Sequence, residues 1–163
     1  MVAYTACNLK QMAQLLSAPF FRNLSMIKSS IIHPELLSIL ARCGHKTQIL
    51  IADSNHSFVI NSNPRSEIIY LNFAPDMLNA TDVLNGVIQL INVESTSMMA
   101  WPDDFDNTIH SEYVRILPQG TEMKFQERED FYSTAKSPNT LLVIATGETR
   151  RFANLMLTVG AVK

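Results

Sequence analysis

Two ionisable residues, His45 and Asp53, flank a short apolar stretch at positions where a polar side chain can face a cleft. His45 follows Gly44, which ends a predicted helix, and Asp53 follows the predicted strand 48–52. An imidazole titrates near about pH 6.5 and can exchange a proton at neutral pH, whereas a carboxylate accepts hydrogen bonds. Their pairing makes this stretch a candidate functional site. Each residue also has a simpler interpretation, His45 as a surface or helix-capping residue and Asp53 as a turn residue.

A helix followed by a strand must position this pair. Pro34 suits the first helical position, and Glu35 favours a helix N-terminus. The run 48–52, with the sequence QILIA, has the composition of a buried strand. Apolar side chains at helical spacing fill the segment before Gly44, namely Leu36, Leu37, Leu40 and Cys43.

Polar residues also follow the clearest buried strand of the chain, 141–145. The turn 146–149 comes directly after it, and 152–154 leads into a final strand or short helix at 155–159. A ligand that reaches such a turn meets backbone donors, a carboxylate, an aromatic ring and an amide together. This spacing predicts a binding site at the strand end.

Arg128 is predicted to lie on a helix near residues 127–136. Phe131 and Ala135 follow it at helical spacing, so the three side chains share one face. This placement favours an anchored guanidinium group. The alternative is an arginine whose aliphatic part covers apolar surface while its charged end reaches water.

The remaining patterns complete an α/β domain with a central sheet covered by helices in three layers. Residues 67–71 and 123–125 are predicted strands, and 109–117 is a predicted helix. Another helix is predicted to begin at Asp76 as its N-cap and to extend towards Ile91. Because 163 residues suit one ordinary domain, we expect one domain over 26–163.

Composition argues against several classes of function. The net charge of −2, with scattered lysines and arginines, gives no reason to expect a nucleic-acid or membrane partner, and no apolar run could span a bilayer. Cys7 and Cys43 lack metal-ligand spacing, which favours a reduced, cytoplasmic protein. Asp103, Asp104 and Asp106 lack the pattern of a calcium loop, and no phosphate-binding motif is present, so no metal or cofactor is expected.

Residues 1–25 contain no acidic residue and are interpreted as an N-terminal extension or the product of an upstream start codon. A transit peptide and an additional packed helix are the alternatives.

Two long motifs resemble the family of L-fucose mutarotases and D-ribose pyranases. The first is PELLSILARCGH-KTQ-ILIADSNH within residues 34–56, and the second is ATGETRRFANLMLTVGAV at 145–162. The resemblance implies that His45, in the Gly-His pair, is the proton donor and that Asp53 binds sugar. It also implies a sugar-binding triplet at Phe152, Ala153 and Asn154.

The resemblance further implies the substrate and the assembly. Arg128 stands where fucose-type members have arginine and ribose-type members tend to have histidine, so L-fucose is the expected monosaccharide. D-ribose, another aldose, or sugar binding without catalysis remain alternatives. Members form rings or dimers with sites at subunit contacts. Eight extended residues span roughly 26 Å, so His45 and Asp53 must either approach through a turn or come from different chains of a homo-oligomer.

Three departures from the family pattern bear on the sugar and the rate rather than on the fold. Residues 46–48, Lys-Thr-Gln, replace a glycine followed by two acidic residues. Phe152 replaces the usual tyrosine and lacks its hydroxyl group. The Phe-Pro pair that usually follows the loop after the first strand is missing.

Overall fold

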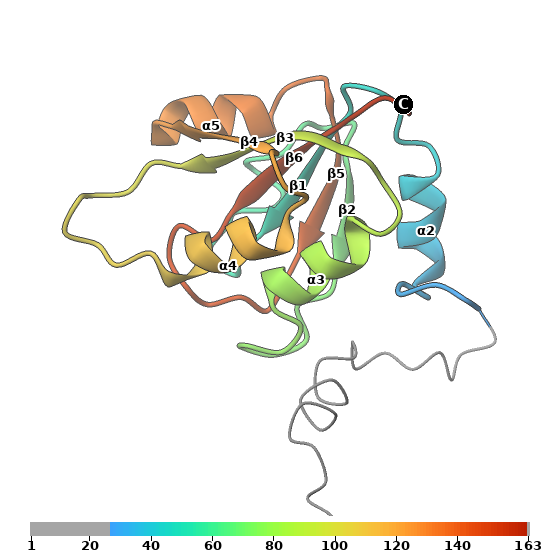
Figure 1. Cartoon of the computed structure of the whole chain (residues 1–163), viewed down its shortest axis with the longest axis horizontal. Coiled ribbons are helices and arrows are strands. Elements are labelled where there is room, and N and C mark those ends of the chain that lie inside the picture. Colours follow the sequence, from blue (N-terminus) through green and yellow to red (C-terminus); the bar gives the residue numbers. More distant parts are fainter. Residues whose placement is uncertain (1–26, 163) are drawn as a thin grey trace, which may run out of the picture. The chain divides into compact units, whose positions relative to one another are not determined.

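Six strands form one mixed sheet in the computed structural model, in the order β2-β5-β1-β6-β3-β4 (Figure 1). The structure describes residues 27–162. β2, β5 and β1 are parallel, β3 and β4 are parallel, and β6 is antiparallel to both β1 and β3. Five strands therefore run in one direction. The strands are β1 (Gln48–Ala52), β2 (Glu67–Tyr70), β3 (Val93–Met99), β4 (Glu122–Gln126), β5 (Thr140–Ala145) and β6 (Leu155–Val159).

Helices cover both faces of the sheet and confirm the expected three-layer α/β fold (Figure 1). β1 shows why both faces need a cover, because alternate residues of a strand point to opposite sides. Ile49 and Ile51 belong to one buried cluster, and Leu50 and Ala52 belong to the other. The first cluster packs against α2 (Pro34–Leu40), α3 (Ala80–Val87) and α4 (Thr108–Ile116), and the second packs against α5 (Arg128–Ala135).

The strand directions decide which loops meet. β1 and β5 are parallel neighbours, so the segments that follow Ala52 and Ala145 emerge at the same edge of the sheet. β6 runs the other way, so the residues before Leu155 reach that edge too. His45 precedes β1 and therefore lies towards the opposite edge. From Ile31 onward the chain forms one compact unit, whereas the predicted extension 1–25 lies outside the described residues.

Three predicted helix boundaries were wrong. α3 begins at Ala80 with Asn79 as its N-cap, rather than at Asp76, and it ends at Val87, before Ile91. The segment before it is held in a turn, because the N–H of Asp76 donates to Gly147 O and the N–H of Gly147 donates to Leu78 O. α2 likewise ends at Leu40, before Gly44. For residues 155–159, the structure resolves the alternatives in favour of a strand.

Replacing Gly147 by alanine is expected to destabilise the protein by more than about 2 kcal/mol. A β-carbon at this position would lie 2.1 Å from Met77 O and 2.5 Å from Ala74 O, both of which are backbone atoms. Gly44→Ala is the matched control, since its β-carbon would meet no atom within 4 Å. Urea denaturation of the two variants measures the difference. Equal midpoints would contradict the close packing at Gly147.

Candidate functional site

A pocket of about 330 Å³ lies at the sheet edge where β1 ends and β6 begins. Small-molecule sites usually measure roughly 300–1,000 Å³, so this volume suits a ligand as small as one monosaccharide. Four residues predicted from the sequence lie together in its wall, namely Asp53, Arg128, Phe152 and Asn154. The other lining residues are Asn55, His56, Met99, Tyr132 and Arg151.

Asp53 and Asn154 form the polar base of this pocket. Their exposed fractions are only 2% and 5%. The backbone N–H of Asp53 donates to Oδ1 of Asn154 at 3.0 Å, and Nδ2 of Asn154 donates to Oδ2 of Asp53 at 2.8 Å. The N–H of Asn55 donates to the other carboxylate oxygen at 2.9 Å. This pairing holds the carboxylate and the amide in one fixed orientation.

Burial raises the pKa of Asp53 to about 6, and backbone hydrogen bonds from Asn55, Ala153 and His56 oppose this shift only in part. The negative charge of Glu148 raises the pKa further. Asp53 therefore changes its protonation state close to neutral pH, although its side chain is almost completely buried. Such a group can accept a hydrogen bond or exchange a proton with a ligand hydroxyl group.

Phe152 has a backbone φ of 59°, in the left-handed region that is uncommon for an aromatic residue. Strained residues of this kind often occur at functional sites. Its ring contacts that of Phe105 edge to face at 5.0 Å, and the Arg151 guanidinium lies 5.3 Å from the ring centre. These neighbours fix the aromatic ring in the pocket wall.

Ala153, the middle residue of the predicted triplet, does not line the pocket and is completely buried. Its carbonyl oxygen accepts a hydrogen bond of 2.7 Å from the Tyr113 hydroxyl group on α4. The small side chain and this bond anchor the backbone between Phe152 and Asn154. Ala153 thus positions its two neighbours.

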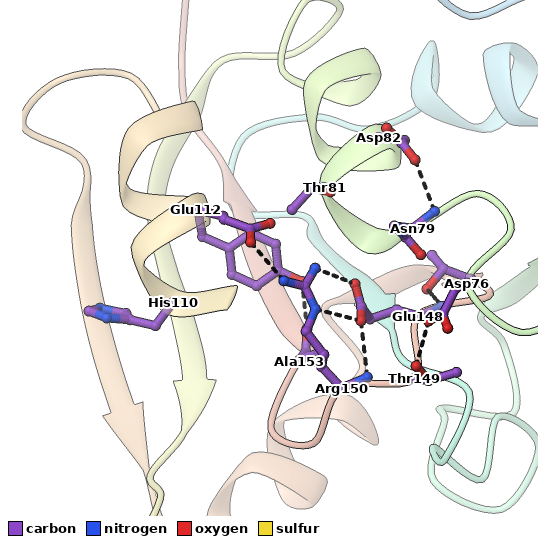
Figure 2. A network of polar contacts seen from close by, with 12 residues as sticks. Asp76, Asn79, Thr81, Asp82, His110, Glu112, Glu148, Thr149, Arg150 and Ala153 are labelled. Atoms are coloured by element: carbon purple, nitrogen blue, oxygen red, sulfur yellow. Dashed lines mark hydrogen bonds and ion pairs between the residues drawn. The ribbon is translucent and has the colours of Figure 1, made fainter. Parts of the chain in front are cut away.

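An ion-paired network supports the turn that precedes the triplet (Figure 2). Glu148 is 1% exposed, and both of its carboxylate oxygens accept hydrogen bonds from the Arg150 guanidinium, at 2.9 and 2.8 Å. Arg150 also donates to Glu112 on α4 at 2.8 Å. Burial would raise the pKa of Glu148, but the hydrogen bonds from Arg150 outweigh burial and hold it below its ordinary value. The network ties α4 to the pocket loop.

Arg128 is the first residue of α5, and its side chain lines the pocket. Phe131 and Ala135 anchor the helix because both are completely buried, as their spacing predicted. Arg128 itself is exposed. Within residues 27–162 its guanidinium has no hydrogen-bond or ion-pair partner, so its donors are available to a ligand.

His45 lies apart from the pocket, beyond the other end of β1. Its Nε2 is 2.9 Å from Oε2 of Glu94, a carboxylate that also pairs with Lys46. His45 lines a different groove, which shares no residue with the pocket that contains Asp53. Within one chain, the structure therefore does not bring His45 and Asp53 together, although the sequence analysis paired them.

Five pocket residues escaped the sequence analysis: Asn55, His56, Met99, Tyr132 and Arg151. Met99 ends β3, whose carboxyl end lies at the pocket edge, but the strand order that places it there has no local signal. Tyr132 follows a predicted core residue on α5. The sequence does contain a signal for Asn55 and His56, because both closely follow an aspartate at the end of a strand.

Among residues 27–162 no group of three or more His, Cys, Asp or Glu side chains is placed to hold a metal ion. No helix in the same range combines the length and apolar character needed to cross a membrane.

Comparisons with known proteins give consistent matches over most of the chain. A family model described as the RbsD / FucU transport protein family matches residues 26–162. The fucose mutarotase of Danio rerio is 31% identical over 147 residues, covering 82% of this chain and 91% of that protein. The D-ribose pyranase of Geobacillus kaustophilus is 29% identical over 135 residues, covering 83% and 94%.

A solved structure extends the comparison to three dimensions. The crystal structure of the fucose mutarotase from Streptococcus pneumoniae, in complex with L-fucose, superposes with a TM-score of 0.70 at 28% sequence identity. The match covers 86% of this chain and 100% of that chain.

Proposed function

The chain belongs to the RbsD/FucU family, and from that premise we propose that it interconverts the α and β pyranose anomers of a monosaccharide, with L-fucose as its substrate. The family includes fucose mutarotases and D-ribose pyranases. The observation that carries the proposal is the gathering of Asp53, Arg128, Phe152 and Asn154 around one small polar pocket.

The reaction needs two proton transfers and no redox step. The anomeric hydroxyl group loses a proton and the ring oxygen gains one as the bond between the ring oxygen and the anomeric carbon breaks, which gives an open-chain aldehyde. Rotation about the neighbouring carbon–carbon bond and reclosure give the other anomer. A positioned proton-transfer group contributes about 10² to 10⁴ in rate. In this proposal His45 donates a proton to the ring oxygen and solvent takes the proton of the anomeric hydroxyl group, while Asp53, Arg128 and Asn154 hold sugar hydroxyl groups beside the ring of Phe152.

The position of His45 supports a site completed by a second copy of the chain. The four residue steps of β1 alone span roughly 13 Å, so His45 and Asp53 of one chain do not reach the same monosaccharide. His45 is a half-exposed side chain, with 51% of its surface accessible, and an adjoining subunit could receive it. We therefore propose a cytoplasmic homo-oligomer in which His45 of one subunit faces the pocket of another.

Arg128 supports L-fucose over D-ribose, because the fucose-type pattern has arginine at this position. The relatives do not decide between the sugars, since fucose mutarotases and D-ribose pyranases match at similar identity. NMR exchange spectroscopy on L-fucose, D-ribose and D-galactose tests the assignment. Faster anomer exchange for L-fucose than for the other two supports it, and preferential acceleration of D-ribose would identify a pyranase instead.

A non-catalytic sugar-binding protein is the second candidate. The contact between His45 Nε2 and Glu94 favours it, because this ring nitrogen already has a partner within the chain. Saturation-transfer NMR separates the two candidates. Sugar binding without accelerated anomer exchange would indicate a binding protein.

Arg128→Lys is expected to weaken sugar binding about tenfold. Lysine keeps the charge but loses the planar group of donors that can bind two hydroxyl groups at once. Isothermal titration with L-fucose measures the change, and Arg115→Lys on the exposed side of α4 is the control. An Arg128 variant that binds as tightly as the wild type would make Arg128 a surface residue.

A further inference from the structure

His56 has no role in the function proposed above, although it lines the same pocket as Asp53, Arg128 and Tyr132. Its exposed fraction is 5%. Both ring nitrogens are buried, and neither has a hydrogen-bond partner of good geometry within the described part of the chain, although the Asn61 backbone lies near the ring. Its ring lies between aromatic neighbours, 5.9 Å from the Phe58 ring and 6.0 Å from the Tyr132 ring.

Such a residue is costly for the folded protein. Each buried polar atom that gives up its water without gaining a partner lowers stability. Phenylalanine or leucine would fill the space between two aromatic rings without this penalty. The histidine ring is therefore better suited to a polar partner that binds in the pocket than to packing between two aromatic rings.

We propose that His56 is a further sugar-contacting residue, whose neutral imidazole forms a hydrogen bond with a hydroxyl group of the bound monosaccharide. This inference rests on the proposed function, because it takes the pocket's ligand to be a sugar. A neutral imidazole has one N–H donor and one acceptor nitrogen, which matches a hydroxyl group in either direction. Burial also lowers the pKa of His56, although the Asn61 backbone opposes the shift, and the ring stays neutral at pH 7.

Tyr132 provides the way for a sugar to reach the imidazole. Its ring lines the pocket, contacts His56 and is only partly buried. Displacement of this single side chain by the sugar would open the imidazole to a hydroxyl group. The sheet and the buried part of α5 need not move, because Phe131 and Ala135 hold the helix on the sheet.

His56→Phe gives a test in which stability and binding change in opposite directions. The variant is expected to raise the unfolding temperature by about 2 to 4 °C, because it removes the unpaired ring nitrogens. It is expected to bind L-fucose about tenfold more weakly, because the hydroxyl group then faces an apolar ring. His56→Gln, which restores a donor and an acceptor, should recover part of the affinity. A purely structural histidine predicts no selective loss of binding.

His110→Phe is the matched control, since His110 also lies between two aromatic rings, those of Trp101 and Phe125, but outside the pocket. It should bind sugar as the wild type does. Sugar titration of ¹⁵N-histidine-labelled full-length protein adds a direct readout, in which the His56 ring nitrogens shift and those of His110 do not. Unchanged affinity in folded His56→Phe, or unshifted His56 nitrogens at saturating sugar, would overturn the inference while leaving the proposed function intact. Failure of the wild type to bind L-fucose, D-ribose or D-galactose would overturn both.

Discussion

Asp53→Asn is expected to lower the rate of L-fucose anomer exchange about 100-fold. Asparagine has nearly the same shape, but it places an amide NH₂ group where one carboxylate oxygen now accepts from the Asn154 amide. Two donors then face each other, and the pocket loses its buried negative charge. The loss of hydrogen bonds that involve a charged group, each contributing about 1.5–3 kcal/mol, accounts for this magnitude.

Asp76→Asn is the matched control for this measurement. Asp76 is also a loop carboxylate near the strand ends, and its side chain accepts a hydrogen bond from Thr149 outside the pocket (Figure 2). Exchange spectroscopy should give wild-type rates for this variant, and circular dichroism should show that both variants fold. Equal rates in the Asp53 and Asp76 variants would remove Asp53 from the site.

The wild type and Asp53→Asn also test the environment of Asp53, through the pH dependence of their free energies of unfolding. Because the pKa of Asp53 is about 6 in the folded protein, above the ordinary aspartate value of 3.8 that applies to the unfolded chain, the folded protein holds this proton more tightly. The resulting stabilisation is complete below about pH 4 and is lost as the pH rises through 6. The wild type should therefore lose on the order of 3 kcal/mol relative to Asp53→Asn between pH 4 and pH 7. Parallel stability curves would indicate an ordinary carboxyl group.

Mixing two inactive variants is expected to restore activity if the site is shared between subunits. His45→Ala alone should lose at least about 100-fold in rate, because it removes the proposed proton donor. In an equal mixture with Asp53→Asn, random subunit exchange gives about one quarter of the sites an intact His45 and an intact Asp53 from different chains. The mixture should therefore recover about a quarter of wild-type activity.

A chain that carries both substitutions controls for this recovery. Mixed with His45→Ala, it offers no intact His45 and should remain inactive. Light scattering establishes the assembly state in parallel. A monomeric protein with full activity would contradict a site at a subunit contact, and so would an inactive mixture in which subunits have demonstrably exchanged.

Local patterns predicted the elements closest to the site. The strand 48–52 matches β1, and the predicted position of Asp53 directly after it is confirmed. Apolar runs of this kind identify buried strands because both of their faces are covered. The pocket then follows from parallel and antiparallel pairing, which brings Asp53 to Asn154 across 101 positions of sequence.

Features that depend on strand order or on long-range packing could not be predicted. The reversed direction of β6 is not visible in its sequence, yet it decides that Asn154 meets Asp53. His56 sits in a polar loop sequence, and its burial comes from the neighbouring Phe58 and Tyr132. Asp76 suited a helix start, but hydrogen bonds to Gly147 fixed it in a turn.

Anomer exchange at equilibrium tests the central claim most directly. NMR exchange spectroscopy measures conversion between the α and β resonances of L-fucose with and without the full-length protein, at a pH where spontaneous exchange is slow. We predict that the wild type accelerates this exchange in proportion to its concentration and that Asp53→Asn at the same concentration does not. Exchange at the spontaneous rate in the presence of folded wild-type protein that binds L-fucose would contradict the claim that this chain is a mutarotase of that sugar.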